Sequence, residues 1–363
     1  MANLLDGLPQ LYQRLLPELF GQQVPVEEKA TCSNCAMCQP KDSVEPVDGR
    51  SRFFRADTKC CTYHPRLPNY LVGGLLSDPD PPWAVGQRRM RERIAGRVAI
   101  SPQWVRPPAK YSLFYSNQRN AFGKSASLLC PFFEKDGGLC TIWPYRETVC
   151  STYYCKYVAG ADGRNLWTSV KTFLTLVEVQ LTRYAILEVD KELLLSAEDQ
   201  SAAGSPGPLS AEALDDLPLP PRDYQRHWRN WVGREEEFYR ACHQKVTELD
   251  RGGLEQILGL DGTIELQHLT RRHAAATSNQ LPRTLRFNPS TTVSWLPDRR
   301  VALACYSELD AIALPGDAYA MLVRFTGKEP VAKVRSDLRQ QLSQDLSDEI
   351  LLTLYQHRVL IEA

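Results

Sequence analysis

Apolar and polar positions follow different patterns in three parts of the chain. Residues 1–160 show little sustained periodicity and contain prolines and turn signals, which predicts a loop-rich region that needs cross-links to stay ordered. Residues 161–280 show helical periodicity on either side of a Pro/Gly-rich loop at 201–222, and residues 281–363 alternate strand-like and helical runs. The patterns predict an α+β fold made of three units with these boundaries.

Helical spacing is clearest in the middle of the chain. Between 165 and 200 apolar side chains recur every three or four residues, which predicts one long helix. The stretch 223–250 predicts further helix, interrupted at Gly233. Near the N-terminus, leucines at helical spacing predict an amphipathic helix through Leu4, Leu8, Leu11, Leu15 and Leu19.

The C-terminal part predicts strands and helices in alternation. Four short strands are expected at 284–288, 292–296, 301–306 and 310–314. A short helix after the Pro-Gly-Asp turn, helices that begin at Val331 and Ser347, and a final strand at 358–363 complete the pattern.

The charge balance argues against several classes of function. Lys and Arg together number 43, as do Asp and Glu, so no global field attracts nucleic acid or an anionic membrane. The basic run 88–94 is interpreted as a solvated helix face. Asp6 and the missing basic segment argue against a secretion signal, and no run approaches the ~18 apolar residues of a membrane span. We therefore expect a cytoplasmic protein with reduced thiols.

Eleven cysteines are the main candidate chemistry, and nine of them fall between positions 32 and 155. Reduced thiols at such spacing take up metal readily, whereas free structural cysteines are the alternative interpretation. The Cys-x-x-Cys-x-x-Cys run at 32–38 is typical of iron–sulfur ligation. The side chains of adjacent Cys60 and Cys61 diverge, so we expect them to serve two sites or to leave one spare thiol. The predicted metal ligands are Cys32, Cys35, Cys38, Cys60, Cys61, Cys130, Cys140, Cys150 and Cys155.

The third group of cysteines has the most definite expected geometry. In "CPFFEKDGGLC" (130–140) the Lys-Asp-Gly-Gly turn predicts a β-hairpin that returns Cys140 to Cys130. The turn or short helix that follows then adds Cys150 and Cys155. Cys242 and Cys305 stand apart from these groups, and we interpret both as inert, buried thiols.

This third group also resembles a known family. Cys-Pro-Phe-Phe at 130–133, the glycine turn, Cys-Thr-Ile-Trp at 140–143 and "YRETVC" are similar to the second half of the CxxCxxCC-type cysteine-cluster family, which is described as zinc- or iron-chelating. The resemblance covers about 30–160 and implies that Cys130, Cys140 and Cys150 bind metal. The first half departs from the family pattern, because twenty-one residues separate "CSNCAMC" from the Cys60-Cys61 pair. The flagellin lysine-N-methylase is similar in a looser way, through its clustered cysteines.

The spacing of the cysteines does not identify the metal. The excess of cysteine and the two-residue ladder favour iron–sulfur clusters of the 4Fe-4S type, and His64 favours zinc if it is a ligand rather than an ordinary core or surface histidine. Two clusters are expected. One would lie on Cys32, Cys35, Cys38 and one of the adjacent pair, and the second on Cys130, Cys140, Cys150 and Cys155.

The C-terminal unit has the element order of a winged helix. Its hydrophobic pattern, ending in "LLTLYQHRVLIE", resembles the peptide chaperone of pyrroloquinoline quinone (PQQ) biosynthesis and related leader-peptide recognition domains. The resemblance implies that a peptide binds as an added strand. The helix expected at 347–357 begins with acidic residues and is poor in Lys and Arg, so nucleic-acid binding is disfavoured. A purely structural cap on the cysteine domain is the alternative.

Two functions agree with these observations. The first is an iron–sulfur protein that modifies or handles a peptide or protein partner bound by the C-terminal unit. The second is a zinc-stabilised interaction protein without catalytic activity. The sequence contains no Ser-His-Asp, metalloprotease or phosphate-loop pattern, so it identifies no catalytic residue and leaves enzymatic activity open.

Overall fold

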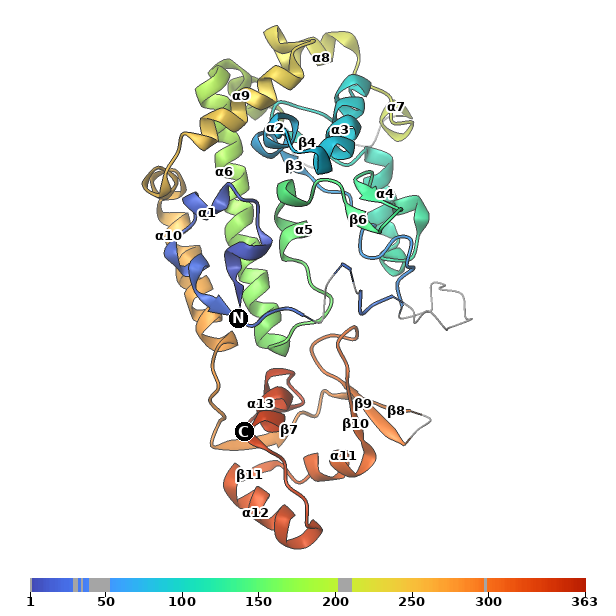
Figure 1. The fold of residues 1–363 in the computed structure, drawn as a ribbon, viewed down its shortest axis with the longest axis vertical. Coiled ribbons are helices and arrows are strands. Elements are labelled where there is room, and N and C mark those ends of the chain that lie inside the picture. The colour runs from blue at the N-terminus through green and yellow to red at the C-terminus, as the bar shows by residue number, and fades with distance from the viewer. Residues whose placement is uncertain (1, 29–31, 34, 39–52, 202–210, 297–298) are drawn as a thin grey trace.

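The computed structural model shows a helical body with a smaller unit of strands and helices at one end (Figure 1). Each part has its own hydrophobic core, one built from residues between Leu4 and Ala276 and the other from residues between Leu285 and Leu360. The mixture of helices with small antiparallel sheets confirms the predicted α+β class. The structure describes residues 2–28, 32–33, 35–38, 53–201, 211–296 and 299–363.

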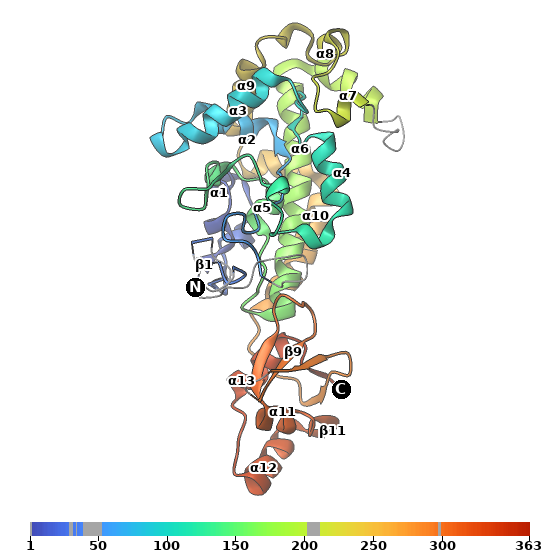
Figure 2. The same cartoon turned by 90° about the vertical axis from the view of Figure 1, so that its right-hand side faces the viewer.

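Helix α6 (Gly160–Ser201) runs through the helical body, and α10 (Arg251–Ala276) packs along it (Figure 2). The long helix expected between 165 and 200 is therefore confirmed. Asp190 interrupts it with φ −159° and ψ 93°. The apolar positions that predicted this helix face the core, since Leu166, Val170, Phe173, Val177 and Leu181 are all buried.

The helical stretch expected at 223–250 is also confirmed, together with its break. Helix α8 (Pro221–Trp228) and α9 (Glu235–Thr247) flank Gly233, whose φ of +80° ends the helical path as only glycine does readily. A short helix, α7 (Ala211–Leu214), precedes them. Among the described helices, none combines the length and the apolar composition that crossing a membrane requires.

Three helices lie in the region for which the sequence predicted mainly loops. They are α2 (Asn69–Ser77), α3 (Ala84–Gly96) and α4 (Ala109–Asn117), and the short strands β3 (Leu67–Pro68) and β4 (Trp104–Val105) pair beside them. Helix α2 is buried on all sides, so its sequence has no amphipathic period to detect. Helix α3 carries the basic run, in which Arg88 and Arg91 are exposed but Arg89 and Arg93 are partly buried, so the predicted solvated face is present only in part.

The single N-terminal helix predicted from the leucine spacing is wrong. The segment forms a 3₁₀ turn (Leu4–Gly7), the short helix α1 (Tyr12–Leu15) and a second 3₁₀ turn (Glu18–Gly21), because Pro9 and Pro17 interrupt the helical path. Strands β1 (Ala2–Asn3) and β2 (Gln23–Val24) pair and close the segment. Leucines still face the core, with Leu4, Leu8 and Leu15 buried.

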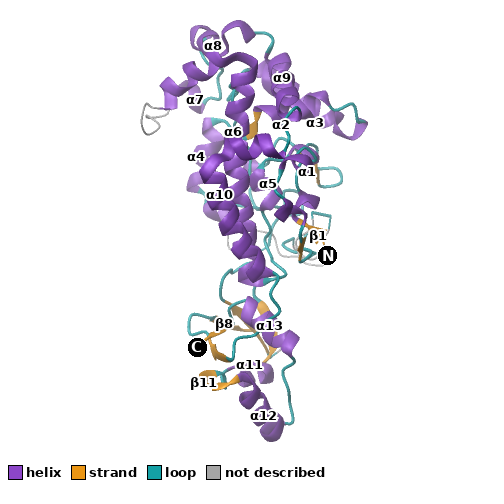
Figure 3. Cartoon of the chain, turned by 90° about the vertical axis from the view of Figure 1, so that its left-hand side faces the viewer, coloured by secondary structure: helices purple, strands orange, loops and turns teal. Residues whose placement is uncertain are grey.

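Two three-stranded antiparallel sheets build the C-terminal unit (Figure 3). In one, β9 (Arg300–Ala304) lies between β8 (Thr292–Trp295) and β10 (Ile312–Pro315). In the other, β7 (Thr284–Phe287) lies between β11 (Thr326–Pro330) and β12 (Leu360–Glu362). Helices α11 (Gly316–Leu322), α12 (Val331–Leu342) and α13 (Asp348–Gln356) complete it. Every strand and helix predicted here is present. Among the described strands of this unit, only β11 was missed, because its sequence "TGKEP" is polar and its pairing is irregular.

Candidate metal centre

The hairpin predicted from the glycine turn carries two of the cysteines. Strands β5 (Phe133–Glu134) and β6 (Leu139–Cys140) pair with Phe133 opposite Cys140, and the Thr141 N–H donates to the Phe132 carbonyl at 2.9 Å. The turn uses Gly137 and Gly138 with φ of +90° and +65°. The ribbon brings the Cys130 and Cys140 thiols together, as the sequence predicted.

Helix α5 (Thr148–Thr152) directs Cys150 toward the same place. Glu147 caps the helix by accepting hydrogen bonds from the N–H groups of Val149 at 2.8 Å and Cys150 at 2.9 Å. Glu178 of α6 accepts from the Thr148 N–H at 2.6 Å. Burial raises the pKa of both carboxyl groups. Two buried acids therefore hold the first turn of α5 and fix the position of the Cys150 backbone.

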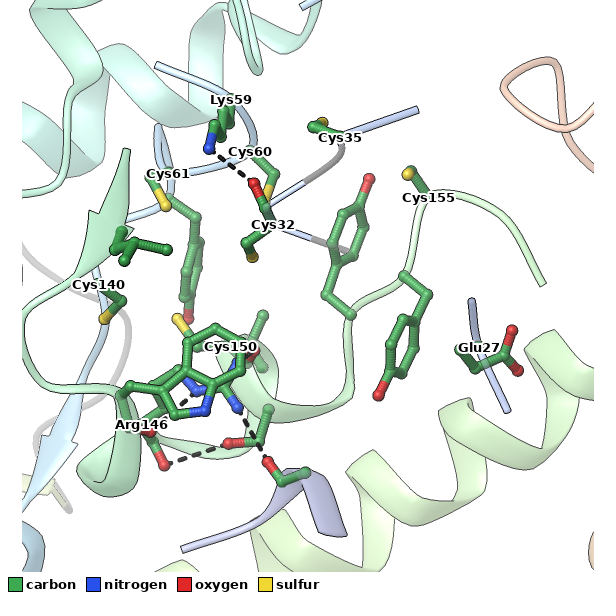
Figure 4. Close-up of a pocket in the computed structure, with 18 of the residues that line it drawn as sticks. Glu27, Cys32, Cys35, Lys59, Cys60, Cys61, Cys140, Arg146, Cys150 and Cys155 are labelled. Atoms are coloured by element: carbon green, nitrogen blue, oxygen red, sulfur yellow. Dashed lines mark hydrogen bonds between the residues drawn. The ribbon is translucent and has the colours of Figure 1, made fainter. Parts of the chain in front are cut away.

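Eight of the nine predicted ligands line one cavity of about 940 Å³ (Figure 4). They come from four separate segments of the chain, and the cavity wall between them is mostly aromatic and aliphatic. Cys38 is the ninth, and it contacts the site through a hydrogen bond with the Cys35 thiol. The eight are Cys32, Cys35, Cys60, Cys61, Cys130, Cys140, Cys150 and Cys155.

The adjacent cysteines lie between two groups of thiols in this cavity. The carbonyl of Cys61 accepts a hydrogen bond from the Cys130 N–H at 2.8 Å, so Cys61 lies with the hairpin. The Cys60 thiol is hydrogen-bonded to the Cys61 thiol, which with burial raises its pKa, and Cys60 also lies near Cys32 and Cys35. Because the two adjacent thiols contact each other, their side chains do not diverge as predicted, and the assignment of one to each site stays a prediction.

Cys155 does not lie where the sequence placed it. Burial and then the nearby Cys35 and Cys60 raise the pKa of its thiol to about 12, which makes it a neighbour of the first group. The thiols around Cys150 are instead Cys130 and Cys140. Figure 4 shows Cys155 on the side of Cys35, and Cys61 on the same side of the view as Cys140. The two groups are Cys32, Cys35, Cys38, Cys60 and Cys155, here called the first set, and Cys61, Cys130, Cys140 and Cys150, here called the second set.

Backbone N–H groups point at several of the sulfurs. The N–H of Phe132 donates to the Cys130 Sγ at 3.4 Å, and the Met37 and Cys38 N–H groups donate to the Cys35 Sγ. The Cys38 thiol and these N–H groups lower the pKa of Cys35 to about 6. Burial raises the pKa of the Cys130 thiol to about 12. A loop that aims N–H groups at a sulfur favours the thiolate, the form of cysteine that binds metal.

The donor set fits a thiophilic metal, although the thiols are not in coordinating positions. Within the described part of the chain, no three Cys, His, Asp or Glu side chains are arranged to hold one metal ion. All eleven cysteines are free thiols. Cysteine side chains turn about a single torsion, so the sulfurs that line this cavity have some freedom to move toward a shared metal. Their number and softness suit zinc or iron–sulfur clusters.

Two cations, not identified as site residues from the sequence, join the segments of the cavity. Lys59 Nζ donates to the carbonyls of Cys32 at 2.6 Å and Gly138 at 2.8 Å, so it links the first set to the hairpin. Arg146 donates to the carbonyls of Cys150 at 3.1 Å and Gly7 at 2.9 Å. The position of Lys59 directly before Cys60 was the available signal, because a cation beside thiolates offsets their charge.

Replacing Lys59 with methionine is expected to lower the free energy of unfolding by about 1.5–3 kcal/mol, because two carbonyls lose a charged donor. Metal content should fall with it, since the link between the Cys32 loop and the hairpin is lost. Urea denaturation and metal analysis measure both effects. Lys110→Met, at an exposed position of α4, serves as the control. Equal stability and equal metal content for Lys59→Met and Lys110→Met would show that this link is not needed.

His64 is a buried neutral side chain outside the cavity wall. Its ring packs edge-on against Tyr111 at 5.2 Å, and its side chain does not line the cavity. Burial lowers the pKa of the imidazole to about 3. These observations favour the interpretation of His64 as an ordinary core histidine over a zinc ligand.

Acid is expected to destabilise the metal-free protein through His64. Its imidazole has a pKa near 6.5 in the unfolded chain and about 3 in the folded one, so between these values only the unfolded state binds the proton. Stability contributed by His64 is thus lost as the pH falls below about 6.5, at up to about 1.4 kcal/mol per pH unit. The free energy of unfolding should differ less between pH 7.5 and pH 5.5 for His64→Gln than for the unsubstituted chain. Identical differences in the two proteins would contradict this.

The two remaining cysteines lie away from the cavity. Cys242 is fully buried in the core of the helical body, and burial raises its thiol pKa. Cys305 is half-buried in the C-terminal unit, where its thiol lies 3.3 Å from the Thr291 hydroxyl. The prediction of a buried thiol is confirmed for Cys242 and wrong for Cys305, which is only half-buried. Comparisons of the chain with protein-family models, curated proteins and solved structures find no match.

Proposed function

We propose that the cysteine-lined cavity holds metal, with iron–sulfur clusters of the 4Fe-4S type favoured, and that the chain modifies or handles a peptide or protein partner bound by its C-terminal unit. In this proposal 1–160 is a metal-bound, loop-rich domain, 161–280 is a helical region, and 281–363 is a winged-helix-like binding unit. The convergence of eight cysteines from four segments on one cavity is the observation that carries the proposal.

The choice of metal rests on the number of thiols and their environment. Each set offers at least four cysteines, which is the ligand count of one 4Fe-4S cluster. N–H groups that point at Cys35 and Cys130 stabilise negative sulfur, and Lys59 lies between the two sets. A bound cluster would supply electron transfer or, with an open ligand position, activation of a substrate. Reduced thiols in such number suit the cytoplasm, where we place the protein.

Binding of a peptide is supported by the open edges of the two small sheets. Among the described strands, β8, β10, β11 and β12 each pair on one side only. Main-chain groups on such an edge are available to an added strand. The Trp295 side chain at the end of β8 is 65% exposed, which places a large apolar surface beside one edge. Acidic residues at the start of α13, Asp348 and Glu349, argue against DNA as the partner.

Metal analysis of protein purified without oxygen tests the proposal. A brown protein with ~8 iron and ~8 sulfide per chain is expected for two four-iron clusters. Half of these values would indicate one cluster. Colourless protein with stoichiometric zinc and no labile sulfide would remove the iron–sulfur proposal, and protein that takes up neither metal on reconstitution would remove the metal site altogether.

The alternative is a zinc-stabilised interaction protein without catalysis. The second set favours it, because Cys130 is buried against Phe132 and Phe133, and a closed tetrahedral site needs no approach for substrate. A structural zinc ion there would stabilise the hairpin, and the C-terminal unit would bind its partner without chemistry. The zinc outcome of the same metal analysis selects this function.

A further inference from the structure

A short connector, residues 156–160, joins the first set of thiols to the C-terminal unit. Two residues after Cys155, the N–H of Tyr157 donates to Asp310 Oδ2 at 3.1 Å. The next N–H, of Val158, donates to Glu27 Oε2 at 2.8 Å, and Glu27 precedes Cys32 by five residues. Thus the segment that follows Cys155 is held on one side by Glu27 and on the other by the C-terminal unit.

Asp310 is a buried part of this contact and does not lie on the surface. It belongs to the loop between β9 and β10, and only 6% of it is exposed. Besides Tyr157, its carboxylate accepts a hydrogen bond from the Tyr306 hydroxyl and lies 3.8 Å from the imidazole of His357. A buried carboxylate needs such partners, so the connector and the C-terminal unit share one polar centre.

The surrounding contacts make the junction tight. Arg358 pairs with Asp162 at 2.5 Å, and Arg164 donates to the Tyr306 carbonyl at 2.5 Å. Gly160 approaches α13 so closely that a Cβ there would lie 2.6 Å from the Gln356 carbonyl oxygen. The backbone at Gly160 also has φ of +53°, which disfavours any side chain.

We propose that metal binding by the first set and docking of the C-terminal unit are energetically coupled through Asp310, which acts as the positioning residue for Cys155. Docking orders the connector and so removes part of the entropy cost of bringing Cys155 to a metal. By linkage, metal bound at Cys155 must tighten docking by the same factor. The inference rests on the proposed metal function and adds a regulation to it: a partner that binds the C-terminal unit and shifts it would alter the first set.

Co²⁺ is the probe, because cobalt thiolate sites absorb in the visible and near ultraviolet and report each bound ion. Titration of the metal-free full chain is expected to show two thiolate sites. In Asp310→Ala and in Gly160→Ala, one site should bind Co²⁺ about tenfold more weakly or more, within the usual range of coupling, while the other is unchanged. Asp310→Asn retains an acceptor for the Tyr157 N–H and should recover most of the loss. Lys333→Ala, on the exposed surface of α12, is the matched control.

Hydrogen exchange of the unsubstituted chain gives a readout that needs no variant. Addition of Co²⁺ should slow exchange in 156–160 and in 306–311 together, and Cys155→Ser should abolish the effect in both segments. Absence of any cobalt thiolate absorption would refute the metal site itself. Normal absorption with unchanged exchange in 306–311, or with equal Co²⁺ affinity in Asp310→Ala and Lys333→Ala, would refute the coupling alone.

Discussion

Replacing Cys150 with serine is expected to lower metal content by about half and to reduce soluble yield at the same time. Cys150 belongs to the second set, and loss of one of four ligands removes the metal bound there. Metal binding and folding are coupled in loop-rich domains, so the metal-free hairpin region should expose apolar surface and aggregate. Metal analysis and the soluble fraction of purified protein measure the two effects. Cys130→Ser, in the same set, should behave alike.

Serine is close to cysteine in size, which separates ligand loss from a packing defect. The cap from Glu147 uses the backbone N–H of Cys150 and survives the substitution. Cys305→Ser is the matched control, because Cys305 lies outside the cavity and its contact with the Thr291 hydroxyl suits an alcohol equally well. Wild-type metal content in both Cys130→Ser and Cys150→Ser would contradict the assignment of the second set.

Gly73→Ala is expected to destabilise the helical body strongly. Alanine normally stabilises a helix by about 1 kcal/mol relative to glycine. At this position of α2, however, a Cβ would lie 1.9 Å from the Tyr239 carbonyl oxygen and 2.8 Å from the His243 Cβ. The backbone of α9 cannot move aside as a flexible side chain can, so α2 and α9 must move apart. Overpacking should dominate, with a net loss of about 3 kcal/mol in the free energy of unfolding.

The matched control for this prediction is Gly96→Ala at the end of α3. A Cβ at Gly96 meets nothing within 4 Å, so only the helix propensity acts, and a small stabilisation is expected. Urea denaturation of the two variants beside the unsubstituted chain provides the comparison. If Gly73→Ala matched Gly96→Ala in stability, the close packing of α2 on α9 would be wrong.

Local patterns predicted the elements in which neighbouring residues decide the structure. The period of Leu166, Val170 and Phe173 predicted α6, and the glycine turn predicted the hairpin that brings Cys130 and Cys140 together. The N-terminal leucines led to a wrong prediction, because their spacing is helical while Pro9 and Pro17 prevent a continuous helix. Helix α2 was missed since a segment buried on every side shows no period.

By itself the sequence determined the inventory of thiols, the ribbon that pairs two of them and, apart from β11, the order of elements in the C-terminal unit. Only the tertiary structure decided that Cys155 lies with Cys35 and Cys60, that Lys59 joins two distant carbonyls, and that Asp310 holds the connector after Cys155. The physical reason is the range of the interactions. Spacing along a chain fixes side-chain direction over one or two turns, whereas contacts between residues a hundred or more positions apart depend on how separate elements pack.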